Sequence, residues 1–347
     1  MTDINRTLED PPPADAGLFG VDFNGEQNEV VLIGVPWEPT ASYGRGSSQT
    51  PRTIIKASHQ LDFYDPFLGR ELATEIGMLP LEPQWEDNNR KAIELADEIH
   101  QGSAEGERRA RVLAEVNDIS AQLNRELAHR VASLLRAGKT VGILGGDHSS
   151  PLGAIKSIHA HHPRMGILHI DAHHDLRCAY EGFTYSHASI MFNVLREVGE
   201  ELPLVSVGIR DFSKSEYLLA AARTNITTFY DHHLQNQLHA GASWASLCKA
   251  ILEHCPEELY VSFDIDGLDP KCCPNTGTPV PGGLSFGQAV YLLEEAVRSG
   301  HRIVGFDLCE VSPGPGSPVG EWDLNVGARI LHKLCALAWA SRRPKSS

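Results

Sequence analysis

Short apolar runs recur along the chain and predict buried β-strands. Each run is apolar almost throughout instead of alternating with polar residues, which is typical of strands covered on both faces. The runs span residues 30–36, 140–147, 165–171, 203–210, 226–231, 259–266 and 302–308.

Helix-like segments separate these runs. The pattern predicts helices at residues 92–99, about 112–137, 285–300 and 326–340, and the last two have apolar residues three and four positions apart. Alternation of strands with helices predicts an α/β fold, with one parallel sheet covered by helices on both sides.

The apolar pattern also defines the domain organisation. Residues 1–27 contain three consecutive prolines and little periodicity, so we expect an N-terminal arm laid over the surface or over a neighbouring subunit. Residues 28–347 are predicted to form a single domain. The highly charged stretch 85–109 is predicted to be a surface insertion.

The charge of the chain limits the kinds of molecule that it could bind. The 347 residues carry a net charge of -15, and Lys and Arg form no cluster. This disfavours nucleic acid and anionic membranes as partners and favours a cationic ligand. The N-terminus lacks the apolar core of a signal peptide and no segment approaches the roughly 18–20 apolar residues of a membrane span, so we expect a cytoplasmic protein. Seven cysteines without a CxxC spacing are predicted to be reduced thiols, mostly in the core.

Acidic groups follow four of the predicted strands. In parallel α/β sheets, ligands bind beyond the carboxyl ends of the strands, so these groups should converge there. They are Asp147 with His148, the segment 171–175, Asp264 with Asp266, and Glu310.

The spacing of these groups predicts a metal centre. Side chains on an extended chain repeat every second residue, so the groups of each segment should face one way. Carboxylates held this close repel one another unless cations neutralise them, and six donors suit two divalent ions. Oxygen-rich donors with imidazole and no thiolate favour Mn, Fe, Co or Ni over a structural zinc, without choosing among them. The six are His148, Asp171, His173, Asp175, Asp264 and Asp266.

Two neighbouring groups are expected to have other roles. Asp147 follows two glycines, where an aspartate usually caps a helix or forms a turn. His174 should point away from its neighbours because of the same alternation, which favours a structural or supporting role over ligation.

Three ordered motifs resemble the signature segments of the ureohydrolases, the arginase and agmatinase family. They are GGDHS (145–149), DAHHD (171–175) and SFDIDGLDP (262–270), and the resemblance extends over roughly residues 28–340. It implies a three-layer α/β/α arginase-like fold, assembly as trimers or hexamers, and hydrolysis of a guanidinium C–N bond by a hydroxide that bridges two metal ions.

The resemblance also implies roles for individual residues. One ion would be held by His148, Asp171, Asp175 and Asp264, and the other by His173 and Asp266 together with the shared Asp171 and Asp264.

Two further positions match the family's pattern. His187, in YSHASI, matches a histidine that passes a proton to the departing amine, a role suited to a pKa near 6.5; the alternative is a buried histidine bonded to a backbone carbonyl. Glu310, in EVSPG, matches the acid that receives the substrate guanidinium, a planar cation suited to bidentate pairing.

Departures from the family's pattern bear on the substrate. Leu176 and Arg177 follow the DAHHD segment, where many agmatinase-like members have Thr and arginases have a polar loop. Arg177 would repel the distal ammonium of agmatine, unless it pairs with Glu181 on the surface. The segment EWDLNVGAR (321–329) also differs from the usual family pattern at this place, which has Asp, a spacer and Thr-Ala.

These departures resemble the branch that hydrolyses guanidine, alkylguanidines or biguanides such as metformin, for which the resemblance implies nickel, with manganese as the alternative. Aromatic residues could wall a small pocket against such a cation, although aromatic side chains are more often in the core. The candidates are Trp37, Tyr180, Phe183, Tyr185 and Trp322.

The sequence therefore favours a dinuclear metallohydrolase that releases urea or a substituted urea, with ammonia or an amine, from a small cationic guanidine compound. One alternative is an agmatinase, which converts agmatine to putrescine and urea. Another is a non-catalytic subunit that supports a homologous partner in a mixed oligomer. A dinuclear phosphoesterase is disfavoured because the sequence offers no basic phosphate clamp.

Overall fold

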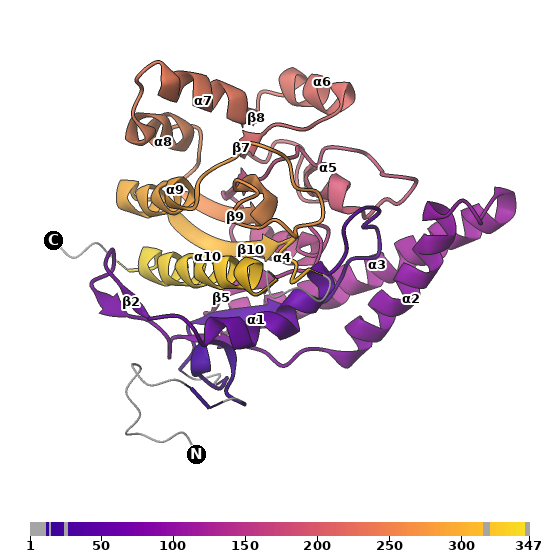
Figure 1. Cartoon of the computed structure of the whole chain (residues 1–347), viewed down its shortest axis with the longest axis horizontal. Helices are drawn as coiled ribbons and strands as arrows, with labels where there is room; N and C mark the ends of the chain where they lie inside the picture. Colours follow the sequence, from indigo (N-terminus) through magenta and orange to yellow (C-terminus); the bar gives the residue numbers. More distant parts are fainter. Residues whose placement is uncertain (1–11, 14, 24–26, 315–319, 344–347) are drawn as a thin grey trace.

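An eight-stranded parallel sheet forms the centre of the protein (Figure 1). The computed structural model describes residues 12–13, 15–23, 27–314 and 320–343. In spatial order, the strands are β4 (Ile76–Met78), β1 (Val30–Gly34), β5 (Thr140–Leu144), β10 (Arg302–Cys309), β9 (Glu258–Asp264), β6 (Gly166–Ile170), β7 (Leu204–Ile209) and β8 (Ile226–Tyr230). A separate antiparallel pair comprises β2 (Tyr64–Asp65) and β3 (Arg70–Glu71).

Helices connect the strands and cover the sheet. They are α1 (Thr50–Ser58), α2 (Pro83–His100), α3 (Gly106–Arg136), α4 (Leu152–His161), α5 (Ile190–Glu197), α6 (Lys214–Ala222), α7 (Asp231–His239), α8 (Trp244–Leu252), α9 (Phe286–Ser299) and α10 (Gly320–Ser341). Short 3-10 helices are η1 (Leu18–Gly20), η2 (Ser47–Gln49), η3 (His187–Ser189) and η4 (Ile265–Gly267).

Each face of the sheet has its own hydrophobic core, so the predicted α/β fold is confirmed and has three layers. Residues of α1, α8, α9 and α10 pack against one face, and residues of α2 to α5 pack against the other. Neighbouring residues of a strand enter opposite cores: Ile167 of β6 joins one, whereas Leu168 and Ile170 join the other. This explains why the strands are apolar almost throughout.

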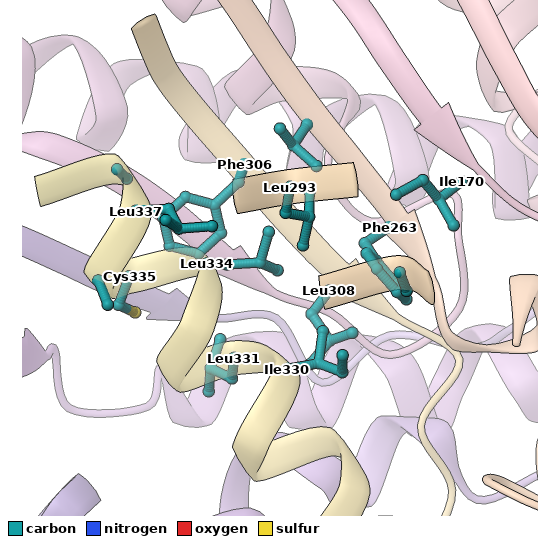
Figure 2. Packing of buried hydrophobic residues seen from close by; sticks show 14 of the residues in the cluster. Ile170, Phe263, Leu293, Phe306, Leu308, Ile330, Leu331, Leu334, Cys335 and Leu337 are labelled. Atoms are coloured by element: carbon teal, nitrogen blue, oxygen red, sulfur yellow. The ribbon is translucent and has the colours of Figure 1, made fainter. Parts of the chain in front are cut away.

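Figure 2 shows the core between α10 and the strands β9 and β10. Phe306 and Leu308 of β10 lie near Leu334 and Ile330 of α10, and all four are fully buried. Burial of each such side chain contributes about 1.5–3 kcal/mol. The central strands, whose ends carry the acidic groups, are therefore anchored on both faces.

All seven predicted strands are confirmed, and each of the four predicted helices lies at the expected place. The predicted run 140–147 ends earlier, at Leu144, because the two following glycines and Asp147 leave the sheet. The edge strand β4 was not predicted, since it has only three residues and one of them is Gly77. The seven cysteines are free thiols, as expected.

The predicted N-terminal arm lies partly outside the described residues, which omit 1–11, 14 and 24–26. Its described part is packed into the protein: Leu18 and Phe19 are buried, and the Phe19 backbone N–H donates to Ser58 Oγ at 2.8 Å. The Phe19 ring contacts His332 of α10 edge-on, with 5.2 Å between centroids. This segment therefore belongs to the core that α1 and α10 form.

Replacing Phe19 with alanine is expected to lower the free energy of unfolding by about 3 kcal/mol or more, because it empties a fully packed aromatic site. Phe23→Ala is a matched control, since Phe23 is 38% exposed, and should cost about 0.5 kcal/mol. Urea unfolding monitored by circular dichroism measures the free energy of unfolding of both variants. Equal effects of the two substitutions would show that the Phe19 segment is not part of the folded core.

The stretch 85–109, predicted to be a surface insertion, lies in a pair of long helices. It covers most of α2 and the start of α3, which pack against each other and extend away from the sheet in Figure 1. Trp85 is buried and its Nε1 donates to Glu126 of α3 at 2.7 Å. Among the described residues, no helix is both long enough and apolar enough to cross a membrane.

Candidate metal centre and substrate cavity

The predicted site residues meet beyond the carboxyl ends of four adjacent central strands. His148 follows β5, Glu310 follows β10, Asp264 ends β9, and the 171–175 segment follows β6. The loop after β5 approaches the chain after β1 closely at Gly146, where a Cβ atom would lie 2.0 Å from the carbonyl oxygen of Trp37. Any other residue would push His148 out of place.

A first cluster surrounds His148. Its Nδ1 lies 3.0 Å from Asp171 Oδ2, 3.2 Å from Asp175 Oδ2 and 3.3 Å from Asp264 Oδ2. All four side chains are buried. One nitrogen and three carboxylate oxygens therefore converge on one point.

A second cluster lies beside the first and shares one carboxylate with it. His173 Nδ1 is 3.1 Å from Asp266 Oδ2 and 3.5 Å from Asp171 Oδ1. Asp171 thus offers Oδ2 to the first cluster and Oδ1 to the second. The structure brings all six predicted metal ligands together.

The charges of the two clusters fit a pair of cations. Burial, and then repulsion from Asp266 and Asp171, raises the pKa of Asp264 well above its usual value. Burial and Asp171 together raise the pKa of Asp175 to about 6. Burial alone would lower the pKa of His148, but its three carboxylate neighbours raise it well above the usual value. Carboxylates forced this close without a fixed cation are unfavourable, and two divalent ions among these oxygen and imidazole donors would relieve the repulsion.

The backbone of the site differs from the extended chain that the spacing argument assumed. Asp175 adopts a left-handed conformation with φ of 53°, and Asp266 lies in η4 and not on a strand. The side chains still converge, because a turn brings Asp175 back toward Asp171. The left-handed conformation costs a non-glycine residue about 1–2 kcal/mol relative to the right-handed one, so the surrounding structure must stabilise it.

Several buried residues support the clusters and were not predicted. His169 Nε2 lies 2.8 Å from Asp171 Oδ2, and Ser262 Oγ lies between His148 Nε2 at 2.9 Å and Asp307 Oδ2 at 2.9 Å. His169 is two residues before Asp171, so the alternation of strand side chains could have identified it. Such partners orient the rings of metal-binding histidines.

Asp147 and His174, which were expected to have structural roles, make contacts of that kind. Asp147 accepts hydrogen bonds from the backbone N–H and hydroxyl of Ser149, which forms a tight turn. His174 points away from both clusters, where its Nε2 lies 3.3 Å from the Tyr230 hydroxyl and its ring packs against Phe212.

A cavity of about 170 Å³ opens onto the clusters. Glu310, buried in its wall, accepts a hydrogen bond from the His148 backbone N–H at 3.0 Å. Burial, and then the nearby Asp147, raises the pKa of Glu310 well above its usual value, so a cation beside it would be stabilised. The lining residues are His148, His173, Asp175, Arg177, Tyr180, His187, Ala188, Asp211, Phe212, Glu216, Asp264, Thr278 and Glu310.

His187 lies in the wall of this cavity, at the start of η3. Its Nδ1 is 3.2 Å from the hydroxyl of Thr40, which also lies 3.5 Å from Asp147 Oδ2. Burial, and then His173 and His148, lowers the pKa of His187 to about 4, so the ring is neutral at pH 7. The His187 ring thus contacts the Thr40 hydroxyl. The alternative interpretation, a buried histidine bonded to a backbone carbonyl, predicted a different partner.

Arg177 and Tyr180 also line the cavity. The alternative pairing of Arg177 with Glu181 is wrong: Arg177 Nε lies 3.4 Å from Glu216 Oε2, and Glu181 lies 3.0 Å from His100 Nε2. The Arg177 guanidinium also lies over the Tyr180 ring at 5.3 Å. This arrangement holds a positive charge in the cavity wall.

The other aromatic candidates lie away from the cavity. Trp37 and Phe183 are buried in hydrophobic cores, and Tyr185 packs against one of them. Trp322 is exposed and its Nε1 donates to the carbonyl oxygen of Lys271 at 3.0 Å. Their side chains therefore do not contribute to the cavity lining.

The α2–α3 pair contacts two loops that lie near the cavity. Arg45 forms an ion pair with Asp97, and His100 pairs with Glu181. The Thr184 backbone N–H donates to Asn117 Oδ1 at 2.9 Å. These contacts tie the loops that carry Thr40 and His187 to the same pair of helices.

Comparison with known proteins agrees with the fold and the clusters. The model of the arginase family matches residues 28–335. The N(1)-aminopropylagmatine ureohydrolase of Thermus thermophilus is 35% identical over 297 residues, which cover 83% of this chain and 84% of that protein. The agmatinase of Bacillus subtilis is 28% identical, over 89% of this chain and 91% of that protein.

Solved structures share the fold at lower identity. The proclavaminate amidino hydrolase of Streptomyces clavuligerus superposes with a TM-score of 0.72 at 22% identity, covering 96% of this chain and 99% of that one. The agmatine ureohydrolase of Thermoplasma volcanium gives 0.68 at 22% identity, covering 92% of each chain. Enzymes of the arginase family use a dinuclear metal centre, and the paired His and Asp clusters fit one. The chain therefore belongs to the arginase family and is a ureohydrolase, a hydrolase that acts on the C–N bonds of guanidino groups.

Proposed function

We propose that this ureohydrolase acts on a small guanidine compound: guanidine itself, an alkylguanidine or a biguanide such as metformin. Water adds its oxygen to the central carbon, one C–N bond breaks, and the products are urea or a substituted urea with ammonia or an amine. The observation that carries the choice of substrate is the Arg177 guanidinium in the wall of the cavity.

The assignment of metal ligands rests on the two clusters. His148, Asp171, Asp175 and Asp264 would hold one ion, and His173, Asp266 and the shared Asp171 would hold the other. The resemblance to the family adds Asp264 as a second shared ligand. Two such ions, when bound, would lower the pKa of a water molecule toward neutrality and would stabilise developing negative charge. Nickel is proposed as the productive metal, with manganese as the alternative.

Glu310 and His187 supply the remaining functions. The Glu310 carboxylate lies beside the clusters and can pair with a guanidinium, which would place the substrate carbon next to them. His187 is neutral at pH 7 and Thr40 orients its ring, so it can accept a proton and release it to the departing amine.

The size and charge of the cavity support a compact substrate. Its volume of about 170 Å³ is below the range of roughly 300–1,000 Å³ typical of ligand pockets. Arg177 already pairs with the buried Glu216, so that carboxylate is not available to a second cation. A substrate with a distal ammonium would bring its charge close to Arg177.

A second candidate is an agmatine-like substrate. The similar proteins named above as agmatinases and aminopropylagmatine ureohydrolases support it. So does Asp211, an exposed carboxylate that also lines the cavity and could receive an ammonium group.

A substrate panel separates the two candidates. Nickel- and manganese-loaded protein would be assayed for urea release or amine release with guanidine, methylguanidine, dimethylbiguanide, agmatine, N(1)-aminopropylagmatine and arginine. We expect the highest kcat/KM with one of the first three. Agmatine or its aminopropyl derivative as the best substrate would contradict the proposal.

The Arg177→Gln variant tests the charge directly. Removing the positive charge should raise kcat/KM for agmatine relative to guanidine by about tenfold or more. Arg196→Gln is the control, because Arg196 is an exposed residue of α5 that pairs with Glu197 outside the cavity. An unchanged ratio in Arg177→Gln would show that Arg177 does not select the substrate.

A further inference from the structure

The peptide group that follows Asp175 is held at both of its polar atoms. The Asp175 carbonyl oxygen accepts hydrogen bonds from the backbone N–H groups of Met191 and Phe192, both at 3.1 Å. These belong to the first turn of α5, where N–H groups have no partner within the helix. On the other side of the same peptide group, the Leu176 backbone N–H donates to Glu216 Oε1 at 3.2 Å. Rotation of this peptide group would break hydrogen bonds at both atoms, so these contacts stabilise the left-handed conformation of Asp175.

Glu216 is a buried carboxylate whose orientation is fixed by the start of α6. The residue is only 3% exposed, and it lines the catalytic cavity. Its Oε2 accepts from the backbone N–H of Ser213 at 2.9 Å and from the Ser213 hydroxyl at 2.7 Å. Ser213 Oγ also accepts from the Glu216 backbone N–H, which completes a capping box. The start of α6 therefore sets the position from which Oε1 reaches Leu176.

The contacts of Glu216 go beyond those of a helix cap. A capping box needs only Ser213 and Glu216, whereas the bond to Leu176 spans 40 residues of the sequence. Glu216 Oε2 also lies 3.4 Å from Arg177 Nε, in the cavity wall. One carboxylate thus joins α6 to the loop that carries both Asp175 and Arg177.

We infer that Glu216 is a positioning residue for the first metal cluster, because its bond to the Leu176 N–H keeps Asp175 in the left-handed conformation. In this conformation Asp175 Oδ2 lies 3.2 Å from His148 Nδ1, within the cluster. Residues that hold metal ligands in place typically change metal affinity by about 10- to 100-fold when they are replaced. The inference rests on the proposed assignment of Asp175 as a metal ligand, and it does not depend on the choice of substrate.

The nickel affinity of Glu216 variants, measured by equilibrium dialysis of the metal-free protein without substrate, tests this role. Glu216→Ala should bind one of the two ions about tenfold or more weakly than the wild type. Glu216→Gln keeps an oxygen that can accept from Leu176, and glutamine also completes capping boxes, so its affinity should stay within about threefold of the wild type. Glu216→Met, which fills the same space without a strong acceptor, replaces Glu216→Ala if the alanine variant does not fold.

Ser213→Ala is the control for the cap. It removes the hydroxyl of the capping box, but the Ser213 backbone N–H still holds the Glu216 carboxylate. This variant should unfold at a lower temperature and keep the nickel affinity of the wild type. A loss of affinity as large as that of Glu216→Ala would show that loosening of α6 is the cause, and it would overturn the inference.

Crystal structures of Glu216→Ala and Glu216→Gln test the conformation without reference to the metal. We expect the peptide group after Asp175 to rotate in the alanine variant and to keep its orientation in the glutamine variant. An unchanged Asp175 conformation in Glu216→Ala would overturn the inference, as would equal losses of nickel affinity in the two variants. A wild-type protein that binds no divalent ion would instead contradict the proposed metal centre, and the two structures alone would then decide the role of Glu216.

Discussion

Asp171→Asn is expected to remove both metal ions and to reduce turnover by roughly 10³-fold or more. The two oxygens of Asp171 face different clusters, with Oδ2 3.0 Å from His148 Nδ1 and Oδ1 3.5 Å from His173 Nδ1. An asparagine would keep the volume but would replace one of these oxygens with an NH₂ group, which cannot ligate a cation.

The charge of Asp171 matters as much as its position. Burial would raise its pKa, but His169, His148 and His173 hold the pKa of Asp171 well below its usual value. The Asp171 carboxylate is thus held in its ionised form by three histidines. Its loss removes the charge that both ions share.

Metal content measured by plasma mass spectrometry, together with urea release, checks this prediction. Asp269→Asn is the matched control: the residue lies in the same loop as Asp266, but its carboxylate contacts Lys271 at the surface. The control should keep the metal content and the activity of the wild type. Full metal content in Asp171→Asn would contradict its placement between the ions.

His187→Ala should retain both ions while turnover falls by about 10² to 10⁴. The ring lies in the cavity wall and contacts Thr40, and it takes no part in either cluster. Its pKa of about 4 leaves the ring neutral at pH 7, so a proton that the ring receives is readily passed on. Loss of the ring therefore removes a proton path and not a metal ligand.

Chemical rescue distinguishes this role from a structural one. Added imidazole should restore part of the turnover of His187→Ala, because the free base can enter the space left by the ring. A merely structural role predicts no rescue. Loss of metal from His187→Ala would show that the residue belongs to the metal centre instead.

The sheet could be predicted because burial on both faces leaves a simple signal in the sequence. Residues 166–170 are apolar except for His169, and residues 259–263 are apolar except for Ser262; the two cores explain why. The edge strand β4 could not be found this way, since three residues with a central glycine carry no periodicity.

The convergence of the site could also be predicted, because the carboxyl ends of parallel strands meet at one edge. The left-handed conformation of Asp175, with φ of 53°, could not be predicted, because the sequence reasoning assumed extended chain through residues 171–175. The pairing of Arg177 with Glu216 joins a loop to α6 across 39 residues, and no local pattern reports such a contact. The contacts of the α2–α3 pair with the cavity loops are long-range in the same way.

We expect the two neighbouring clusters, joined by Asp171, to hold a pair of divalent cations. A crystal structure of the nickel-loaded protein, with anomalous diffraction at the nickel edge, tests it most directly. We predict two anomalous peaks about 3.5–4 Å apart, one beside His148 and the other beside His173. No peak at this position under metal-replete conditions, or a single ion that one cluster holds alone, would contradict the account.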